Sequence, residues 1–110
     1  MLIKDIISKD YLPLTESITL EREYHGIYCG DLLSVVMRSA KRGSILVSVI
    51  SNPNTVAVSM LLDLPCIIIT ENQPITEAMI QKANAEDIAI LSTKLQTHEV
   101  IIDLKDRGCL

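Results

Sequence analysis

Four consecutive passages of about twenty residues, 23–43, 44–65, 66–87 and 88–108, share one pattern of apolar residues. Each opens with a short apolar run and closes with apolar residues at helical spacing. The runs "ILVSVI", "CIIIT" and "IAILST" are nearly continuous and rich in Ile and Val, which is typical of strands covered on both faces in a parallel sheet. "YHGIYC" predicts a weaker strand.

The second half of each passage predicts a helix, because its apolar residues recur every three or four positions. These stripes are Leu32, Leu33, Val35, Val36 and Ala40; Val56, Ala57, Met60 and Leu61; Met79, Ile80 and Ala83; and Val100, Ile101 and Leu104. We expect Asp31, Asn54, Thr76 and Thr97 to cap the helix starts. Gly43 and Gly108 stand where helices commonly finish.

Strict alternation of strand and helix predicts right-handed crossovers, and therefore an α/β fold with a mainly parallel sheet flanked by helices. At 110 residues the chain has the length of one domain, so we expect residues 1–110 to form a single small domain. Residues 1–22 fall outside the pattern. There "IKDIIS" predicts a short helix and "YLPLTESITL" an extended lead-in, which either joins the sheet or reaches a neighbouring subunit.

Composition argues against partners that are large polyanions. The chain has a net charge of −4, and its ten basic residues form no cluster that would hold a phosphate backbone or an anionic membrane surface. It has three Tyr and neither Phe nor Trp, so the stacking platforms of single-strand binders are missing. We therefore expect neither nucleic acid nor membrane as a partner.

The cysteines and the apolar runs indicate a cytoplasmic protein. Cys29, Cys66 and Cys109 are odd in number and form no Cys-x-x-Cys pair, which argues against a disulfide framework and a thiolate zinc site. Polar residues interrupt every apolar run well before the length that spans a bilayer. Charges in "MLIKDIISKD" also argue against a signal peptide.

The segments "GIYCGDLLS" at 26–34, "TVAVSMLLDLPCIIIT" at 55–70 and "AILST" at 89–93 resemble, in this order and spacing, the small stand-alone proteins of the DRTGG-domain family. Similar domains are regulatory segments of some phosphotransacetylases and of pyrophosphatases with CBS domains, and the N-terminal domain of HPr kinase is also similar. The resemblance covers nearly the whole chain. It implies a non-catalytic accessory module that is often dimeric.

Two positions depart from the family pattern. Many members end the strand corresponding to "CIIIT" in Thr-Gly-Gly, whereas Glu71 and Asn72 follow Thr70 here. Two glycines would let a ligand approach bare backbone, and here a carboxylate intrudes. An Asp-Arg pair that is common after the strand at 45–50 is replaced by Ser51-Asn52-Pro53-Asn54. Any anion-binding role of these features in the family does not carry over directly.

Ligands of open α/β sheets bind outside the carboxyl ends of the strands, so the loops after the four predicted strands form the candidate rim. Hydroxyl and carboxamide groups follow these strand ends and suit a small polar ligand that is neutral or singly anionic, such as a nucleoside or nucleotide. The predicted ligand-binding residues are Ser51, Asn52, Asn54, Thr55, Thr70 and Ser92, with Lys94 as a nearby cation. The alternative interpretation of 51–55 is a turn and a helix cap only.

The sequence displays no catalytic constellation. Cys29 precedes a helix start, but Asp31 opposes thiolate formation and no base is placed beside it. His25 and His98 lack the spacing that brings two metal ligands to one helix face. Glycine-rich phosphate loops are missing as well. We therefore predict no catalytic residue, no metal and no cofactor.

These observations favour a regulatory or accessory module that forms a homodimer and binds a small polar ligand at the rim. The alternative is a protein-interaction subunit without a ligand, and an enzyme is the least favoured class. A concave rim would favour the first, and a rim filled by side chains such as Gln73 and Lys94 the second. For the dimer surface we expect the N-terminal segment and the first helix, around Leu32, Val36 and Met37.

Overall fold

The computed structural model describes residues 1–110 and contains the predicted alternation of strands and helices. In chain order the four units are β2 (Ile27–Cys29) with α1 (Leu33–Ser39), β3 (Ile45–Ser48) with α2 (Pro53–Leu62), β4 (Cys66–Ile69) with α3 (Glu77–Ala85), and β5 (Ala89–Ser92) with α4 (Thr97–Asp106). Each strand coincides with an apolar run of the sequence. The predicted α/β class is confirmed.

One five-stranded sheet has the order β1-β5-β4-β3-β2. The strands β2, β3, β4 and β5 are parallel, and each pairs with its neighbours in the sequence. The fifth strand, β1 (Leu12–Pro13), is antiparallel: Leu12 pairs with Ser92 and Pro13 with Leu91. Part of the lead-in therefore joins the sheet of its own chain as an edge strand.

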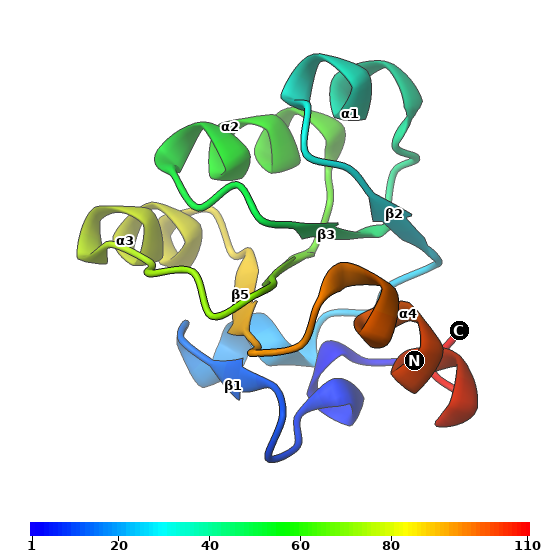
Figure 1. Ribbon diagram of the computed structural model, residues 1–110. Helices are drawn as coiled ribbons and strands as arrows, with labels where there is room; N and C mark the ends of the chain where they lie inside the picture. The colour runs from blue at the N-terminus through cyan, green and yellow to red at the C-terminus, as the bar shows by residue number, and fades with distance from the viewer.

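Both faces of the sheet are buried, and each is covered by a separate core. Side chains alternate along each strand, so neighbouring residues enter different cores. In β3, Leu46 faces a core shared with Val36 of α1, Val56 of α2 and Met79 of α3. Its neighbours Ile45 and Val47 face the second core, which the N-terminal segment and α4 complete. Figure 1 shows the resulting three layers, with α1, α2 and α3 over one face and α4 with the N-terminal segment over the other.

The N-terminal segment is a cover for the second core. The short helix expected in "IKDIIS" is confirmed as the 3-10 helix η1 (Ile3–Ile6), whose Ile3 and Ile6 are buried. A continuous extended lead-in is wrong, because a second 3-10 helix, η2 (Ser17–Glu21), follows β1. Thr19 closes this turn, since its hydroxyl donates to the Glu16 carbonyl.

The two ends of the chain are fastened together. The Tyr24 hydroxyl donates to the Cys109 carbonyl at 2.6 Å, and the Tyr11 hydroxyl donates to Asp103 of α4 at 2.8 Å. From α4, the Arg107 guanidinium donates to the carbonyls of Asp5 and Ile6 in η1. We call these contacts the terminal clasp. It holds α4 and the N-terminal segment on the same face of the sheet.

The predicted helix caps are partly wrong. Thr76 caps α3 as expected, and its hydroxyl accepts from the Met79 N–H. The N-cap of α2 is Asn52 rather than Asn54, because Pro53 already lies in the first turn, where its missing N–H costs nothing. At α1 and α4 the N-caps are Leu32 and Gln96 instead of Asp31 and Thr97.

Candidate functional site

The carboxyl ends of the parallel strands lie along one edge of the sheet, and the loops that follow them form the rim. The β2–α1 loop is tied to the neighbouring strand, since the Asp31 carboxylate accepts from the Ser48 hydroxyl at 3.0 Å and from the Val49 N–H at 2.9 Å. Asp31 thus acts as a loop anchor. Its charge is already matched by two donors.

The β3–α2 loop carries four of the predicted ligand-binding residues. The Asn52 side chain accepts from the Asn54 N–H at 2.8 Å and so caps α2, while both residues are exposed. Ser51 donates to the Pro74 carbonyl of the next loop. Thr55 is fully buried, and its hydroxyl donates to the Ile50 carbonyl at 2.8 Å. The exposed carboxamides are the parts of this loop that face solvent.

The β4–α3 loop has an unusual backbone. Glu71 and Asn72 both adopt the left-handed conformation, at φ 60° and 53°, which favours glycine. Their N–H groups donate to the Leu95 and Thr93 carbonyls of the β5–α4 loop, at 2.9 Å each. Thr70 is buried and shares a hydrogen bond with Thr97. The two backbone donors that follow β4 therefore bind protein and do not form a free anion cradle.

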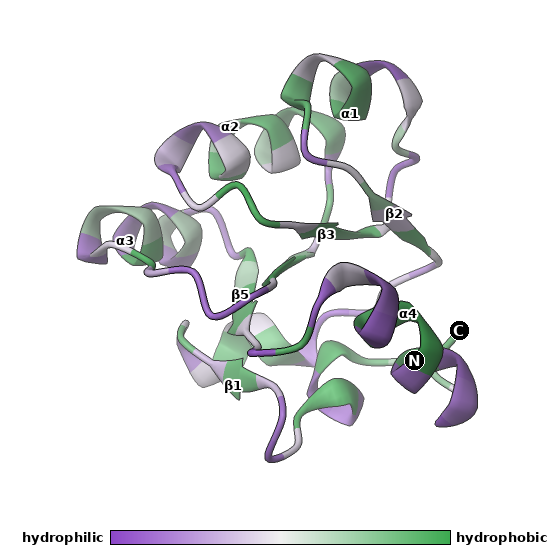
Figure 2. Cartoon of the chain, in the orientation of Figure 1, coloured by the Kyte–Doolittle hydropathy of each residue, from purple (hydrophilic) through white to green (hydrophobic).

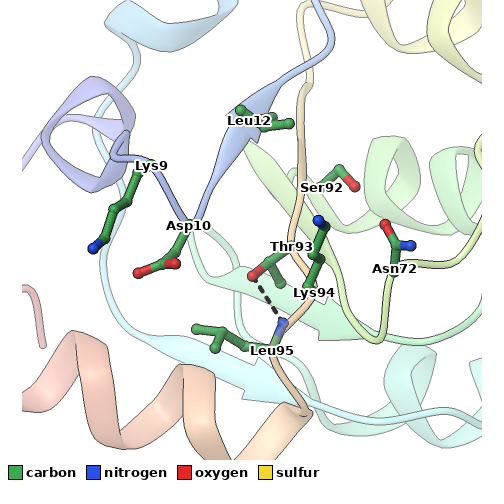
Figure 3. Close-up of a pocket in the computed structure, with 8 residues that line it drawn as sticks. All are labelled: Lys9, Asp10, Leu12, Asn72, Ser92, Thr93, Lys94 and Leu95. Carbon is green, nitrogen blue, oxygen red and sulfur yellow. Dashed lines mark hydrogen bonds between the residues drawn. The ribbon is translucent and has the colours of Figure 1, made fainter.

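A pocket of about 410 Å³ opens between this loop, the β5–α4 loop and the N-terminal edge strand. Its lining residues are Lys9, Asp10, Leu12, Asn72, Ser92, Thr93, Lys94 and Leu95. Figure 3 shows Ser92, Lys94 and Asn72 close together on one side and Lys9 and Asp10 on the other. Hydroxyl, carboxamide and ammonium groups thus share one concave surface with a single carboxylate.

Of the six predicted ligand-binding residues, only Ser92 lines this pocket. Ser51, Asn52 and Asn54 lie on the rim but outside it. The hydroxyls of Thr55 and Thr70 support the rim from within. Lys94, expected as a nearby cation, lines the pocket, whereas Gln73 does not fill it.

Lys9, Asp10 and Leu12 escaped the sequence analysis as pocket residues, because they reach the rim only through the pairing of β1 with β5. The one available signal was the lead-in itself, whose attachment to the sheet was left open. Two residues of antiparallel pairing carry no apolar alternation that could have indicated it.

Two thiols, those of Cys29 and Cys66, and two phenols have raised pKa values. Partial burial of Cys29, and then the nearby Asp31 charge, raise the pKa of this thiol. Complete burial raises the pKa of Cys66. Burial and hydrogen bonding likewise raise the pKa values of Tyr11 and Tyr24. These shifts move each group away from the ionised form that a nucleophile or general base would need.

No three His, Cys, Asp or Glu side chains are grouped so that they could hold a metal ion. No helix has the length and apolar character needed to cross a membrane.

Comparisons with known proteins point to one kind of domain. The family model described as HPr Serine kinase N terminus matches residues 54–106, from α2 to α4. Among solved structures, a similar one is the crystal structure of the CBS and DRTGG domains of the regulatory region of Clostridium perfringens pyrophosphatase, complexed with its activator diadenosine tetraphosphate. A search of curated protein sequences finds no significant match.

The match to the pyrophosphatase region has a TM-score of 0.71 at 15% sequence identity. It covers 92% of this chain and 47% of that chain, so this chain spans about half the length of the region. At such low identity the likeness shows the fold, and the function of the rim has to be argued from its own residues.

Proposed function

We propose that this chain, which is similar to DRTGG domains and to the N-terminal domain of HPr kinase, is a non-catalytic regulatory module that acts as a homodimer and binds a small polar ligand at the rim. The main support for ligand binding is the pocket beside β5, whose lining includes Ser92, Asn72 and Lys94. Its position outside the carboxyl ends of parallel strands is where open α/β sheets bind ligands.

The lining favours a small anion of the nucleotide class. Lys9 and Lys94 outnumber Asp10, so the pocket has a modest positive excess. Ser92 and Asn72 supply hydrogen bonds for a sugar or base. A volume of about 410 Å³ lies in the range of small-molecule pockets. The N–H groups of Glu71 and Asn72 are already occupied, so we expect binding through side chains and moderate affinity.

The exposed carboxamides of Asn52 and Asn54, with Ser51, extend this proposed site along the rim for a ligand larger than the pocket. The buried hydroxyls of Thr55 and Thr70 support the loops of this proposed site through hydrogen bonds within the protein. We also propose that the module works in the cytoplasm, which is supported by three unpaired cysteines.

Calorimetry with AMP, ATP and diadenosine tetraphosphate tests the ligand proposal. We expect one of them to bind the parent protein, and Lys94→Glu to weaken that binding about tenfold or more, because it reverses a pocket charge. The matched control is Lys105→Glu, which reverses an exposed charge on α4 outside the pocket. Lack of binding at millimolar nucleotide, or equal loss in both variants, would contradict the proposal.

The alternative function, a protein-interaction subunit without a ligand, is favoured by a separate observation. Leu61 of α2 is 67% exposed, and Leu32 beside the start of α1 is 63% exposed. Large apolar side chains at neighbouring helices are typical of protein contact surfaces when they form a patch. These leucines do not line the pocket, so a protein contact at these helices would leave the pocket open.

A further inference from the structure

The outer side of α2 is unlike that of an ordinary surface helix. None of the ten residues of α2 is charged, although surface helices usually carry charges on the side away from the core. Leu61 and Met60 are exposed there, and Ala57 is partly exposed. In Figure 2 the second half of α2 and parts of α1 are green, whereas the start of α2 is purple. This side of the molecule therefore has an apolar centre.

The helices on either side of α2 differ in charge. The chain has no acidic residue between Asp31 and Asp63, while Arg38, Lys41 and Arg42 are exposed at the carboxyl end of α1. At the carboxyl end of α3, Glu86 and Asp87 are exposed together with Lys82 of the last turn, so this end has an excess of negative charge. Arg42 pairs with Asp63 at 2.8 Å, whereas Arg38 and Glu86 form no ion pair within the chain. Unpaired positive and negative ends thus flank the apolar centre.

We propose that this layer of three helices is the surface on which a second copy of the chain docks, with a two-fold axis along α2. The proposal rests on the homodimer of the proposed function and names its surface. Such an axis brings α2 onto α2 of the partner and places α1 over α3 of the partner. The three helices run in the same direction, since each follows a parallel strand, so the basic end of α1 meets the acidic end of α3.

The charges select this arrangement over its alternative. A two-fold axis perpendicular to α2, in the same plane, would place α1 over α1 of the partner. In that arrangement α1 and its copy run in opposite directions, so Arg38 and Lys41 lie over the start of α1 of the partner and away from the acidic end of α3. Only the axis along α2 places the basic end of α1 against the acidic end of α3.

The size of the molecule also requires all three helices. A stable interface buries about 800 Å² on each partner. The molecule measures 30 × 28 × 24 Å between Cα atoms, so a contact of that size covers most of one side. α2 alone is too narrow, and the contact has to include α1 and α3.

The proposed dimer surface differs in part from the one expected from the sequence. Leu32 and Met37 are exposed, but Val36 is fully buried in the core under α1 and cannot contact a partner. The N-terminal segment covers the opposite face of the sheet, so it does not lie in the proposed contact.

The first test compares two exposed apolar residues on opposite sides of the molecule, by sedimentation at micromolar concentration. We expect a dimer for the parent and for Ile102→Glu on α4, where Ile102 is 57% exposed. Leu61→Glu should raise the dimer Kd by about 30-fold or more, because it puts a charge at the interface centre. A dimer that is insensitive to Leu61→Glu overturns the surface and leaves the homodimer standing. A parent that is still monomeric at a concentration about 100-fold higher, roughly 0.1 mM, overturns both.

The second test uses charge reversal and keeps the surface hydrophobicity. Arg38→Glu and Glu86→Lys should each weaken self-association, since each puts like charges opposite one another. An equimolar mixture of the two variants should recover the heterodimer, in which both contacts are again between opposite charges. If the mixture stays as weak as the separate variants, the axis along α2 is wrong.

Discussion

At the scale of single residues, Glu71 and Asn72 show how the chain keeps a left-handed backbone conformation without glycine. Both are left-handed, although neither is glycine. Two hydrogen bonds from their N–H groups to the β5–α4 loop hold this shape in place. Where many family members have Gly-Gly, this chain thus retains a turn that costs free energy. The side chain of Asn72 in turn lines the pocket.

The cost of this turn can be measured with Glu71→Gly. We expect the variant to be more stable by about 0.5 to 1 kcal/mol. Glycine removes the steric cost of the left-handed backbone, but part of this gain is lost because glycine gives the unfolded chain more conformational entropy. Urea unfolding gives the difference. Glu71→Ala keeps the Cβ atom and should show no such gain. An equal gain in both variants would trace the effect to the carboxylate instead.

At the scale of elements, the start of α2 separates the two asparagines that the sequence offers as caps. The Asn52 side chain makes the capping hydrogen bond, whereas Asn54 contributes only its backbone N–H. Asn52→Ala should therefore lower the free energy of unfolding by about 1 kcal/mol. Asn54→Ala should change it by less than about 0.5 kcal/mol. Thermal unfolding of both variants checks this, and a larger loss for Asn54→Ala would contradict the assigned cap.

The elements also show what the sequence could predict. The strands at 45–48, 66–69 and 89–92 are buried on both faces, so their apolar runs are continuous and easily recognised. The helices α3 and α4 have apolar stripes that face the sheet, whereas Met60 and Leu61 of the stripe predicted for α2 are exposed. The first residue of each helix was harder to predict, because several Ser, Thr, Asn or Asp residues lie in the preceding loops and more than one of them could cap the helix. Asp31, for example, anchors the end of β3 instead of capping α1.

The pocket was harder to predict than the fold. Ser92 and Lys94 follow a strand directly, so the general rule for parallel sheets indicated them. Lys9 and Asp10 lie more than eighty residues away in the sequence and reach the pocket through β1 alone. Burial of Thr55 and Thr70 depends on how tightly adjacent loops pack, which spacing along one chain does not encode.

At the scale of the whole molecule, the terminal clasp links stability to pH. Burial, followed by the influence of Cys109, raises the pKa of Tyr24 to about 12 from its ordinary value of 10. A group whose pKa is raised by folding stabilises the protein fully below its unfolded pKa. This contribution is then lost as the pH rises through the folded pKa. The clasp should accordingly weaken between about pH 10 and 12.

Tyr24→Phe tests this link. At pH 7 the variant should be less stable by about 1 kcal/mol, because the Cys109 carbonyl loses its hydrogen bond. Between pH 10 and 12 the difference from the parent should shrink, since the variant has no phenol to ionise at this position. Chemical unfolding across this range measures it, with Tyr28→Phe on β2 as control. A difference that stays constant to pH 12 would disprove the role of Tyr24.

The sheet order has a consequence for the timing of synthesis. β2, β3, β4 and β5 can each join the strand made just before, but β1 near the start of the chain waits for β5 near its end. At ribosomal rates of about 5 to 20 residues per second, Leu12 waits roughly 4 to 16 s for Ser92. During that interval α1, α2 and α3 can cover one face of the growing sheet, while the other face still lacks α4. The nascent chain is then most exposed to wrong contacts, until the two ends close over it.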